Sequence, residues 1–507
     1  MATGDGGATA LIAFEGFEVD DRLRGLLADS RVAGVTLYGS LNIDSAEQTR
    51  RLTEAIQEAA GHPVLVAVDQ EGGQLTAAGP DTTHFAGNMA LGATGDVGLA
   101  EQVGLAIGTE LRALGITVNY APVADIASRP WNPSLGIRSF GEEPDLVGAM
   151  TAAMVAGMQS AGVAATLKHF PGKGEATVDP HHGLPILDLD LDRLERVEFA
   201  PFRSGIKAGA RLLMVGHYGL PAVTGDRETP TSISEVAIKE LIRGRLGFDG
   251  VIVTDALDMG GFGGAAAELP LAAGVDLLLY GPAQIGSLPS WTTQSSPRLA
   301  GLAAWLAVQE QPPLETVGCP AHQELAANLA RCSLTLVRDD NRLVPIRSRS
   351  DDRILAVMPR PTDLTPADTS SMVKPALASA IRARHRQTTE MIIDQEPSDA
   401  QIASVIERAA SHDLIVAGTI DAGPGQARLI AGLLEMDKPV IAVALRTPYD
   451  LARYPSAGTY VCTYGIHPPS MEALAAALFG EASFPGSLPA AVPGIYPVGH
   501  ALADKNR

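Results

Sequence analysis

The stretch AATLKHFPG, residues 164–172, contains the unit on which the predicted fold is based. Small and apolar residues lead up to Lys168 and His169, and Pro171 and Gly172 then end any regular strand. A continuous apolar run of this kind is typical of a strand buried on both faces of a parallel sheet. The stretch therefore predicts a strand whose carboxyl end carries charged side chains.

Similar apolar runs, each ending in polar or glycine-rich residues, recur through the first 281 residues. The others are 10–16, 32–39, 64–73, 116–126, 211–219, 250–259 and 273–281. Helical patterns separate them, among them 46–60, 99–115, 145–162, 192–209 and 232–247. About eight strand–helix repeats predict a (β/α)8 TIM-like barrel and favour it over an open doubly wound sheet.

The pattern changes after Tyr280. Residues 285–298 are rich in Ser, Thr, Pro and Gly and predict a linker, which a helical stretch near 322–333 follows. From Thr335 a second series of strands alternates with helices, as in an open sheet covered on both faces. We therefore expect a catalytic barrel at 1–284, a linker and helix at 285–334, and a C-terminal α/β sandwich domain at 335–507.

The overall composition excludes several kinds of partner. A formal net charge of −20 disfavours nucleic acid and anionic membrane surfaces. No apolar run approaches a membrane span, and the N-terminal one is too short for a signal peptide, so we expect a cytoplasmic protein. The three cysteines are far apart and predict reduced thiols. The sequence does not indicate which oligomeric state the protein adopts.

Polar residues gather at the carboxyl ends of the predicted barrel strands, where active sites of such barrels lie. In chain order they are Asp69, Glu71, Asn119, Asp125, Lys168, His169, His217, Asp255 and Asp258. Several of them converging on one mouth indicate an active site more strongly than any one does alone.

Asp255 directly follows VIVT, four residues that are apolar or favour strands. A carboxylate on a rigid strand end can act as a nucleophile in fixed geometry. The alternative is a helix N-cap, for which Asp258 is the better candidate. The glycine-rich string GGFGGAAA (260–267) lacks the spacing of a dinucleotide fingerprint or a P-loop, and we expect a mobile loop there.

The loop after the strand at 164–170 continues as KGEATVDPHHGLP and places Asp179 two residues before His181. An acid beside an imidazole fixes its tautomer and stabilises its protonated form, as acid/base catalysis requires. His182 competes for the same role, and spacing alone does not separate the two. A zinc site built from His169, His181, His182 and His217 is disfavoured, because two lysines would lie beside the ion.

Long motifs of the chain resemble glycoside hydrolase family 3, specifically its bacterial β-N-acetylglucosaminidase branch. The matching pieces extend over nearly the whole chain. They are VDQEGGQ (68–74), NYAPVADI (119–126), NPSLGIRSFG (132–141), KHFPGKGEATVDPHHGLP (168–185), MVGHYGLPAV (214–223), VIVTDALDM (251–259) and two C-terminal segments, ARCSLTLVRDDNRLVPI and LFGEASFPGSLPAAVPGIYPVGHAL.

The resemblance implies a barrel followed by an α/β sandwich, and removal of a terminal β-linked N-acetylglucosamine with retention. It implies a catalytic set in which Asp255 is the nucleophile and His181, paired with Asp179, is the general acid/base, which favours His181 over His182. It also implies a set of sugar-binding residues, namely Asp69, Arg138, Lys168 and His169. It implies no metal and no other cofactor.

The chain departs from the branch in places, and other functions stay open. PGKG replaces the usual PGHG, with Lys173 in place of histidine, and the usual arginine after the VDQEGG motif is absent. The departures weaken the case for a peptidoglycan fragment and leave room for another aglycone. The alternatives are a phosphorylase that uses phosphate in place of water, a β-glucosidase-like enzyme, and an inactive sugar-binding protein.

Overall fold

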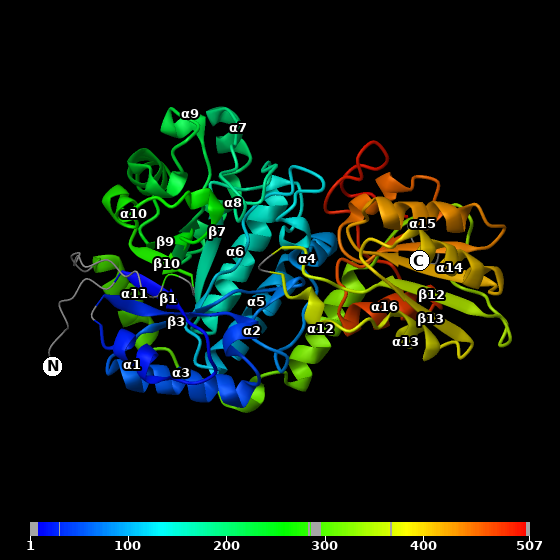
Figure 1. Ribbon diagram of the computed structural model, residues 1–507, viewed down its shortest axis with the longest axis horizontal. Helices are drawn as coiled ribbons and strands as arrows, with labels where there is room; N and C mark the ends of the chain where they lie inside the picture. The colour runs from blue at the N-terminus through cyan, green and yellow to red at the C-terminus, as the bar shows by residue number, and fades with distance from the viewer. Residues whose placement is uncertain (1–8, 30, 282–283, 285–295, 366–367, 503–507) are drawn as a thin grey trace.

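The computed structural model describes residues 9–29, 31–281, 284, 296–365 and 368–502. Figure 1 shows a barrel domain, coloured blue to green, beside a C-terminal domain, coloured yellow to red. Within these ranges no helix is both long and apolar enough to cross a membrane.

The first domain is a closed barrel in which every strand pairs in parallel with its neighbours. Its strands lie in the order β1-β10-β9-β8-β7-β6-β3-β2 around the barrel. Their bounds are β1 Ala10–Ala13, β2 Val32–Leu37, β3 Leu65–Val68, β6 Val118–Asn119, β7 Ala164–Phe170, β8 Leu212–Val215, β9 Val251–Ala256 and β10 Leu277–Tyr280. The predicted barrel is therefore confirmed, and each predicted apolar run contains one of its strands.

The barrel interior is filled with apolar side chains. Leu11, Leu65, Val118, Leu212 and Val253 belong to one buried cluster that the strands share. Helix α11 (Pro297–Ala307) adds its side chains to the same cluster and closes the amino-terminal end of the barrel. The opposite end, where the strands terminate, is left for polar residues.

Helices surround the barrel and connect its strands. Their bounds are α1 Asp21–Leu27, α2 Gly39–Asn42, α3 Ala46–Ala60, α4 Asn88–Thr94, α5 Val97–Ala113, η1 Gly136–Arg138, α6 Pro144–Ser160, α7 Leu191–Arg196, α8 Ala200–Lys207, α9 Pro221–Thr224, η2 Thr231–Ile233, η3 Val236–Arg245, η4 Gly260–Phe262, α10 Glu268–Ala273, η6 Leu314–Thr316 and α12 Pro320–Ser333. A short antiparallel hairpin, β4 (Gln70–Gly72) and β5 (Leu75–Thr76), follows β3.

Two of the predicted helices differ in the structure. The stretch 192–209 forms two helices, α7 and α8, because Pro201 lacks an amide hydrogen and fits only the first turn of a helix. The stretch 232–247 contains the π-helix η3, in which the amide of Leu246 bonds the carbonyl of Leu241 at 2.9 Å.

The second domain is a six-stranded mixed sheet in the order β11-β16-β15-β14-β12-β13. Its strands are β11 Thr335–Asp339, β12 Ile354–Pro359, β13 Thr388–Ile393, β14 Leu414–Thr419, β15 Val440–Ala444 and β16 Thr459–Cys462. Its helices are η7 Ser370–Met372, α13 Leu377–Arg382, α14 Asp399–Ala410, α15 Pro424–Leu434, η8 Pro448–Arg453 and α16 Pro468–Leu478. Only β11 pairs antiparallel, at one edge. This sheet confirms the expected C-terminal α/β fold.

Most of the predicted linker, residues 285–295, lies outside the described residues. Helix α11 begins at Pro297, inside the last part of that linker. The division into 1–284, 285–334 and 335–507 stays our proposal for the domain boundaries.

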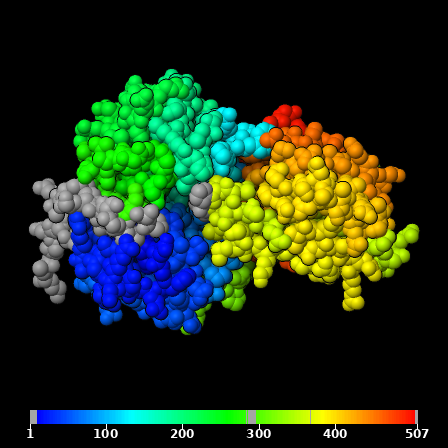
Figure 2. All heavy atoms as spheres, in the orientation of Figure 1, coloured from blue at the N-terminus to red at the C-terminus, as the bar shows by residue number. Residues whose placement is uncertain are grey.

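The two domains contact each other through the β4–β5 hairpin. The carbonyl of Gln74 accepts a hydrogen bond from the amide of Thr369 at 2.9 Å. The ring of His467 bonds the carbonyl of Gly73 at 2.8 Å. Because this hairpin starts just after Asp69, the C-terminal domain lies close to the mouth of the barrel. Figure 2 shows the cyan part of the barrel meeting the orange part of the second domain.

Candidate active site

Four of the predicted site residues meet around Glu71 at the carboxyl ends of β3 and β7. The ammonium of Lys168 lies 2.5 Å from Asp69 Oδ1 and 2.5 Å from Glu71 Oε1. The guanidinium of Arg138 holds both oxygens of Glu71, each at 2.8 Å. The ring of His169 lies 3.3 Å from Arg138 Nη2. These residues form one buried charged network.

The charge states in this network follow from its contacts. Burial by itself raises the pKa of Glu71, but Arg138 and Lys168 outweigh burial and lower the pKa to about 2. Burial lowers the pKa of Lys168, and the neighbouring Asp69 and Glu71 more than reverse that effect. Glu71 is therefore a carboxylate that orients two cations, a role the sequence did not single out.

His169 is held in one orientation by Asp125, which lies 2.7 Å from its Nδ1. Burial, with the nearby charges of Lys173 and Arg138, lowers the pKa of His169 well below its ordinary value. A neutral ring that donates from Nδ1 leaves Nε2 as the acceptor for Arg138. Asp125 also accepts the amide of Lys173 at 2.9 Å. Asp125 is thus an anchor for the start of the loop after β7.

Asp255 lies near the end of β9 and is partly accessible. One oxygen of its carboxylate accepts the amide of Ala256 at 2.9 Å. The buried ring of His217 bonds the carbonyl of Ala256 at 3.1 Å and Ser232 Oγ at 2.7 Å. His217 therefore supports the turn that carries Asp255, and its contacts are those of a structural histidine.

Asp258 does not cap a helix as the sequence suggested. The next element is the short η4, whose first turn has no side-chain cap. The carboxylate of Asp258 lies against Gly281, where a β-carbon would come within 1.7 Å of its Oδ2. Asp258 thus packs at the end of β10.

The loop after β7 brings Asp179 and His181 together. Asp179 Oδ1 lies 2.6 Å from His181 Nδ1 and accepts the amide of His181 at 3.0 Å. Burial raises the pKa of Asp179, but the two hydrogen bonds from His181 and the charges of His181 and Lys173 lower it to about 2. His182 is exposed, and its amide bonds the backbone carbonyl of Asp179. The carboxylate of Asp179 thus holds the ring of His181.

Backbone hydrogen bonds fix this loop beside the end of β9. The amide of Gly260 bonds the carbonyl of His181 at 3.2 Å, and the amide of Gly261 bonds that of Pro180 at 2.8 Å. The expectation of a mobile loop at 260–267 is therefore wrong for its first residues, which form η4. His181 follows Pro180 directly and Gly260 lies five residues after Asp255, so both predicted catalytic groups belong to one face of the barrel.

Lys173 is buried within this face, with only 3% of the residue exposed. In the part of the chain that the structure describes, its ammonium forms neither a hydrogen bond nor an ion pair. Burial and Arg138 lower its pKa to about 7, against the opposing pull of Asp125, Glu71 and Asp255. The position where the branch has histidine thus holds a cation with no fixed partner.

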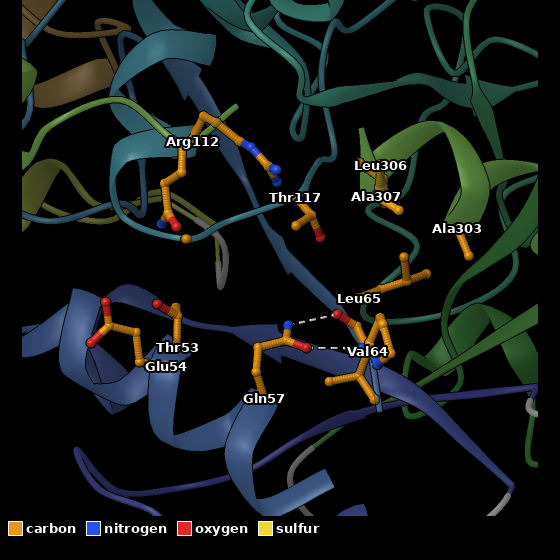
Figure 3. Close-up of a pocket in the computed structure, with 13 residues that line it drawn as sticks. Thr53, Glu54, Gln57, Val64, Leu65, Arg112, Thr117, Ala303, Leu306 and Ala307 are labelled. Atoms are coloured by element: carbon orange, nitrogen blue, oxygen red, sulfur yellow. Dashed lines mark hydrogen bonds between the residues drawn. The ribbon is translucent and has the colours of Figure 1, made fainter. Parts of the chain in front are cut away.

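A cavity of about 240 Å³ lies at the other end of the barrel, beside the amino terminus of β3. Thr53, Gln57, Val64 and Arg112 line it together with α11 (Figure 3). The side-chain amide of Gln57 donates to the carbonyl of Val64 at 2.8 Å and accepts a hydrogen bond from the backbone amide of Val64 at 3.0 Å. Residues at this end of such barrels serve stability, so we assign the cavity no catalytic role.

A closed parallel barrel with carboxylates at its mouth has the architecture of a barrel enzyme, and comparison with known proteins places it among the glycoside hydrolases. Residues 9–294 match the model of the glycosyl hydrolase family 3 N terminal domain. The chain belongs to this family.

Relatives and solved structures extend the similarity over both domains. The chain is 30% identical to beta-hexosaminidase A of Pseudoalteromonas piscicida, over 92% of this chain and 90% of that protein. It is also 30% identical to a beta-N-acetylglucosaminidase/beta-glucosidase of Cellulomonas fimi, over 90% of this chain and 88% of that one. A solved family 3 beta-N-acetylglucosaminidase from Paenibacillus sp. str. FPU-7 superimposes with a TM-score of 0.88 at 32% identity, covering 96% of this chain and 98% of that chain.

Proposed function

We propose that this glycoside hydrolase is a retaining, exo-acting β-N-acetylglucosaminidase (β-N-acetylhexosaminidase). The observation that carries the proposal is the Asp179–His181 pair, which backbone hydrogen bonds fix beside the end of β9, the strand that contains Asp255. The names of the relatives from Pseudoalteromonas, Cellulomonas and Paenibacillus support the same substrate.

In the first step, the Asp255 carboxylate attacks the anomeric carbon and the bond from that carbon to the leaving oxygen breaks. Protonated His181 gives its Nε2 proton to the leaving oxygen and becomes neutral. The products of the step are the free alcohol and a glycosyl ester on Asp255. Retention follows because a second displacement at the same carbon restores the original configuration.

In the second step, neutral His181 takes a proton from water while the water oxygen attacks the anomeric carbon. The ester bond breaks, and Asp255 leaves as a carboxylate. Asp179 stays ionised through the cycle, because its pKa is about 2. Its contact with His181 Nδ1 keeps Nε2 directed to the substrate.

Asp69, Arg138, Lys168 and His169 are proposed to bind the hydroxyls of the terminal sugar. Arg138 and Lys168 are balanced by Glu71 and Asp69, and Asp125 orients the neutral ring of His169. The pocket therefore offers donors and acceptors that are already oriented. A sugar that buries its hydroxyls there needs a partner for each of them. A dense network of this kind suits the binding of a single terminal sugar. An exo-acting enzyme removes such a terminal sugar from its substrate.

Two p-nitrophenyl substrates test the proposal. We expect hydrolysis of the N-acetyl-β-glucosaminide and not of the β-glucoside. Activity on the glucoside alone would favour a β-glucosidase-like enzyme. Turnover of neither would favour an inactive sugar-binding protein. Product configuration followed by NMR should show the β-anomer first, and early release of the α-anomer would contradict retention.

Phosphate is a second candidate for the acceptor, and Lys173 is the observation that favours it. Its unpaired ammonium interacts with Asp255 and Asp179 and would attract an anion. A neutral imidazole at His181 does not repel an anionic acceptor as a carboxylate would. Initial rates in phosphate and in a non-nucleophilic buffer, with a search for a sugar 1-phosphate, decide this point. Absence of the phosphorylated sugar would leave hydrolysis as the activity.

The aglycone and the setting of the reaction are also part of the proposal. A peptidoglycan fragment handled in the cytoplasm, as in peptidoglycan recycling, is one candidate, and another natural glycoside is the other. Hydrolysis of a disaccharide–peptide fragment and of a panel of aryl and alkyl N-acetylglucosaminides, compared by kcat/KM, separates them. If kcat/KM for the peptidoglycan fragment exceeds the other values by less than about tenfold, that result would count against the fragment as the natural substrate.

A further inference from the structure

A second cavity, of about 250 Å³, lies between the two domains and is distinct from the catalytic residues. We call it the interdomain cavity. The barrel contributes Gln74 and residues between 127 and 136, and the C-terminal domain contributes residues from 364–365, 421–423 and 446–453. None of Asp69, Lys168, Asp179, His181 and Asp255 lines it. It is therefore lined by other residues than the catalytic pocket, and its volume lies slightly below the range of about 300–1,000 Å³ that is usual for small-molecule pockets.

The cavity lies where an open α/β sheet is expected to bind a ligand. The residues from the C-terminal domain follow the carboxyl ends of β12, β14 and β15. In the sheet, β12 lies between β13 and β14. The chain passes from β12 to β13 on one side of β12 and then crosses to β14 on its other side, so the strand order reverses beside β12. The crevice outside such a switch point is the usual ligand site of doubly wound sheets.

Three buried side chains around the cavity hold polar atoms with no hydrogen-bond partner among the described residues. They are Gln74 Oε1, Arg446 Nε and Tyr449 Oη. Buried polar groups are nearly always paired, because leaving one unpaired is costly. These three atoms lie just behind the surface of the cavity, so a ligand would pair them only after their side chains turn toward it.

The charge of the wall favours an anion, because Arg129, Arg446 and Arg453 line it against one carboxylate, Asp421. Arg129 and Arg453 line the cavity, and within the described ranges neither forms an ion pair. Arg446 is already paired with Asp368 at 2.8 Å. Two free guanidinium groups are notable in a chain of net charge −20. Guanidinium matches a carboxylate with two parallel hydrogen bonds.

Trp131 gives the cavity an aromatic surface. It is 40% exposed, and the guanidinium of Arg453 lies 4.5 Å from its ring centroid. Its φ of 55° is unfavourable for a bulky side chain, and Asp421, on the opposite wall, has a φ of 43°. These are two of the four such non-glycine residues in the described part of the chain, and backbone strain of this kind concentrates at functional sites.

We propose that the interdomain cavity binds a small hydroxylated anion, of the class of a sugar acid. The two free arginines would hold the carboxylate, Trp131 would pack against a face of the ring, and the neutral polar groups of the wall would bond its hydroxyls. Both domains contribute to the site, so its ligand holds them together. The proposal does not depend on the function proposed for the catalytic pocket.

Isothermal titration with D-glucuronate, and with glucose as the matched neutral sugar, tests the site in the full chain. We expect saturable one-to-one binding of glucuronate and at least tenfold weaker binding of glucose. Arg453→Gln and Trp131→Gly should each raise the Kd for glucuronate at least tenfold. Glycine tolerates the backbone at position 131, and Arg453 is exposed, so both variants are expected to fold.

Two control variants locate the binding. Arg428→Gln changes an exposed arginine of the same domain outside the cavity and should leave the Kd unchanged. Asp69→Asn changes the catalytic pocket and should also leave it unchanged. No binding, equal binding of the two sugars, or loss of binding only in Asp69→Asn would each overturn the proposal.

Discussion

Replacing Lys173 with methionine is expected to stabilise the folded protein, although it removes a charge from the candidate active site. Burial and Arg138 lower the pKa of Lys173 from 10.5 to about 7. At about 1.36 kcal/mol per pH unit, that difference corresponds to a folding penalty of about 5 kcal/mol at acidic pH. Methionine is shorter and leaves part of the space empty, so we expect a net gain of roughly 2–3 kcal/mol.

The sign of the pH dependence follows from the two pKa values. The unfolded chain keeps the lysine proton up to about pH 10.5, whereas the folded protein releases it near pH 7. The penalty is therefore complete below pH 7 and is removed as the pH rises to 10.5. The stability advantage of Lys173→Met should narrow by about 2–3 kcal/mol between pH 6 and pH 9, because about two pH units of that interval lie above the folded pKa.

Urea denaturation at pH 6, 7.5 and 9 measures this effect directly. Lys207→Met, at the exposed end of α8, is the matched control and should show no comparable gain. A variant at position 173 that is less stable than the natural protein at pH 6, or an advantage that does not change with pH, would refute the reasoning. We also expect the variant to lose activity, because a costly buried cation is kept where function needs it.

The remaining predictions concern the proposed catalytic groups. Asp255→Asn should lower kcat by more than about three orders of magnitude with little change in Tm, and a near-normal rate would contradict its role as nucleophile. Asp179→Asn should lower kcat by about 10²–10⁴, while His182→Ala should have little effect; equal losses in the two would contradict the proposed pairing. Gly260→Ala places a β-carbon 2.8 Å from the carbonyl that holds the acid/base loop, and should lower kcat about tenfold or more. Gly301→Ala has open space around its new methyl group and serves as the control, and a similar kcat in both glycine variants would show that the anchor is unimportant.

The barrel could be predicted because its strands are buried on both faces. Continuous apolar runs, as at 164–167 and 251–254, mark such strands, and the first polar residue after each marks its carboxyl end. Parallel strands in a closed barrel direct those ends to one mouth. The meeting of Asp69, Lys168 and His169 therefore follows from local sequence and fold class.

The partners within the site could not be predicted, because they come from distant parts of the chain. Glu71 lies two residues from Asp69, yet its role depends on Arg138, 67 positions further along. The environment of Lys173 depends in the same way on Asp125 and Asp255. The break before Pro201 has a visible signal in the proline itself, which the helical pattern around it obscured.

The anchoring of the loop after β7 also has no local signal. The bonds from Gly260 and Gly261 are made by backbone amides, whose partners no residue type specifies. A glycine-rich stretch is compatible both with mobility and with close backbone packing, and only the fold separates the two.

The most direct test of the account is to trap the covalent intermediate. An activated N-acetylglucosaminide with fluorine on the ring slows both steps, because fluorine destabilises the oxocarbenium-like state. Mass spectrometry of the digested protein should then find one added sugar on the peptide that contains Asp255, and none in Asp255→Asn. A sugar attached to a different residue, or turnover without any attached sugar, would contradict the account.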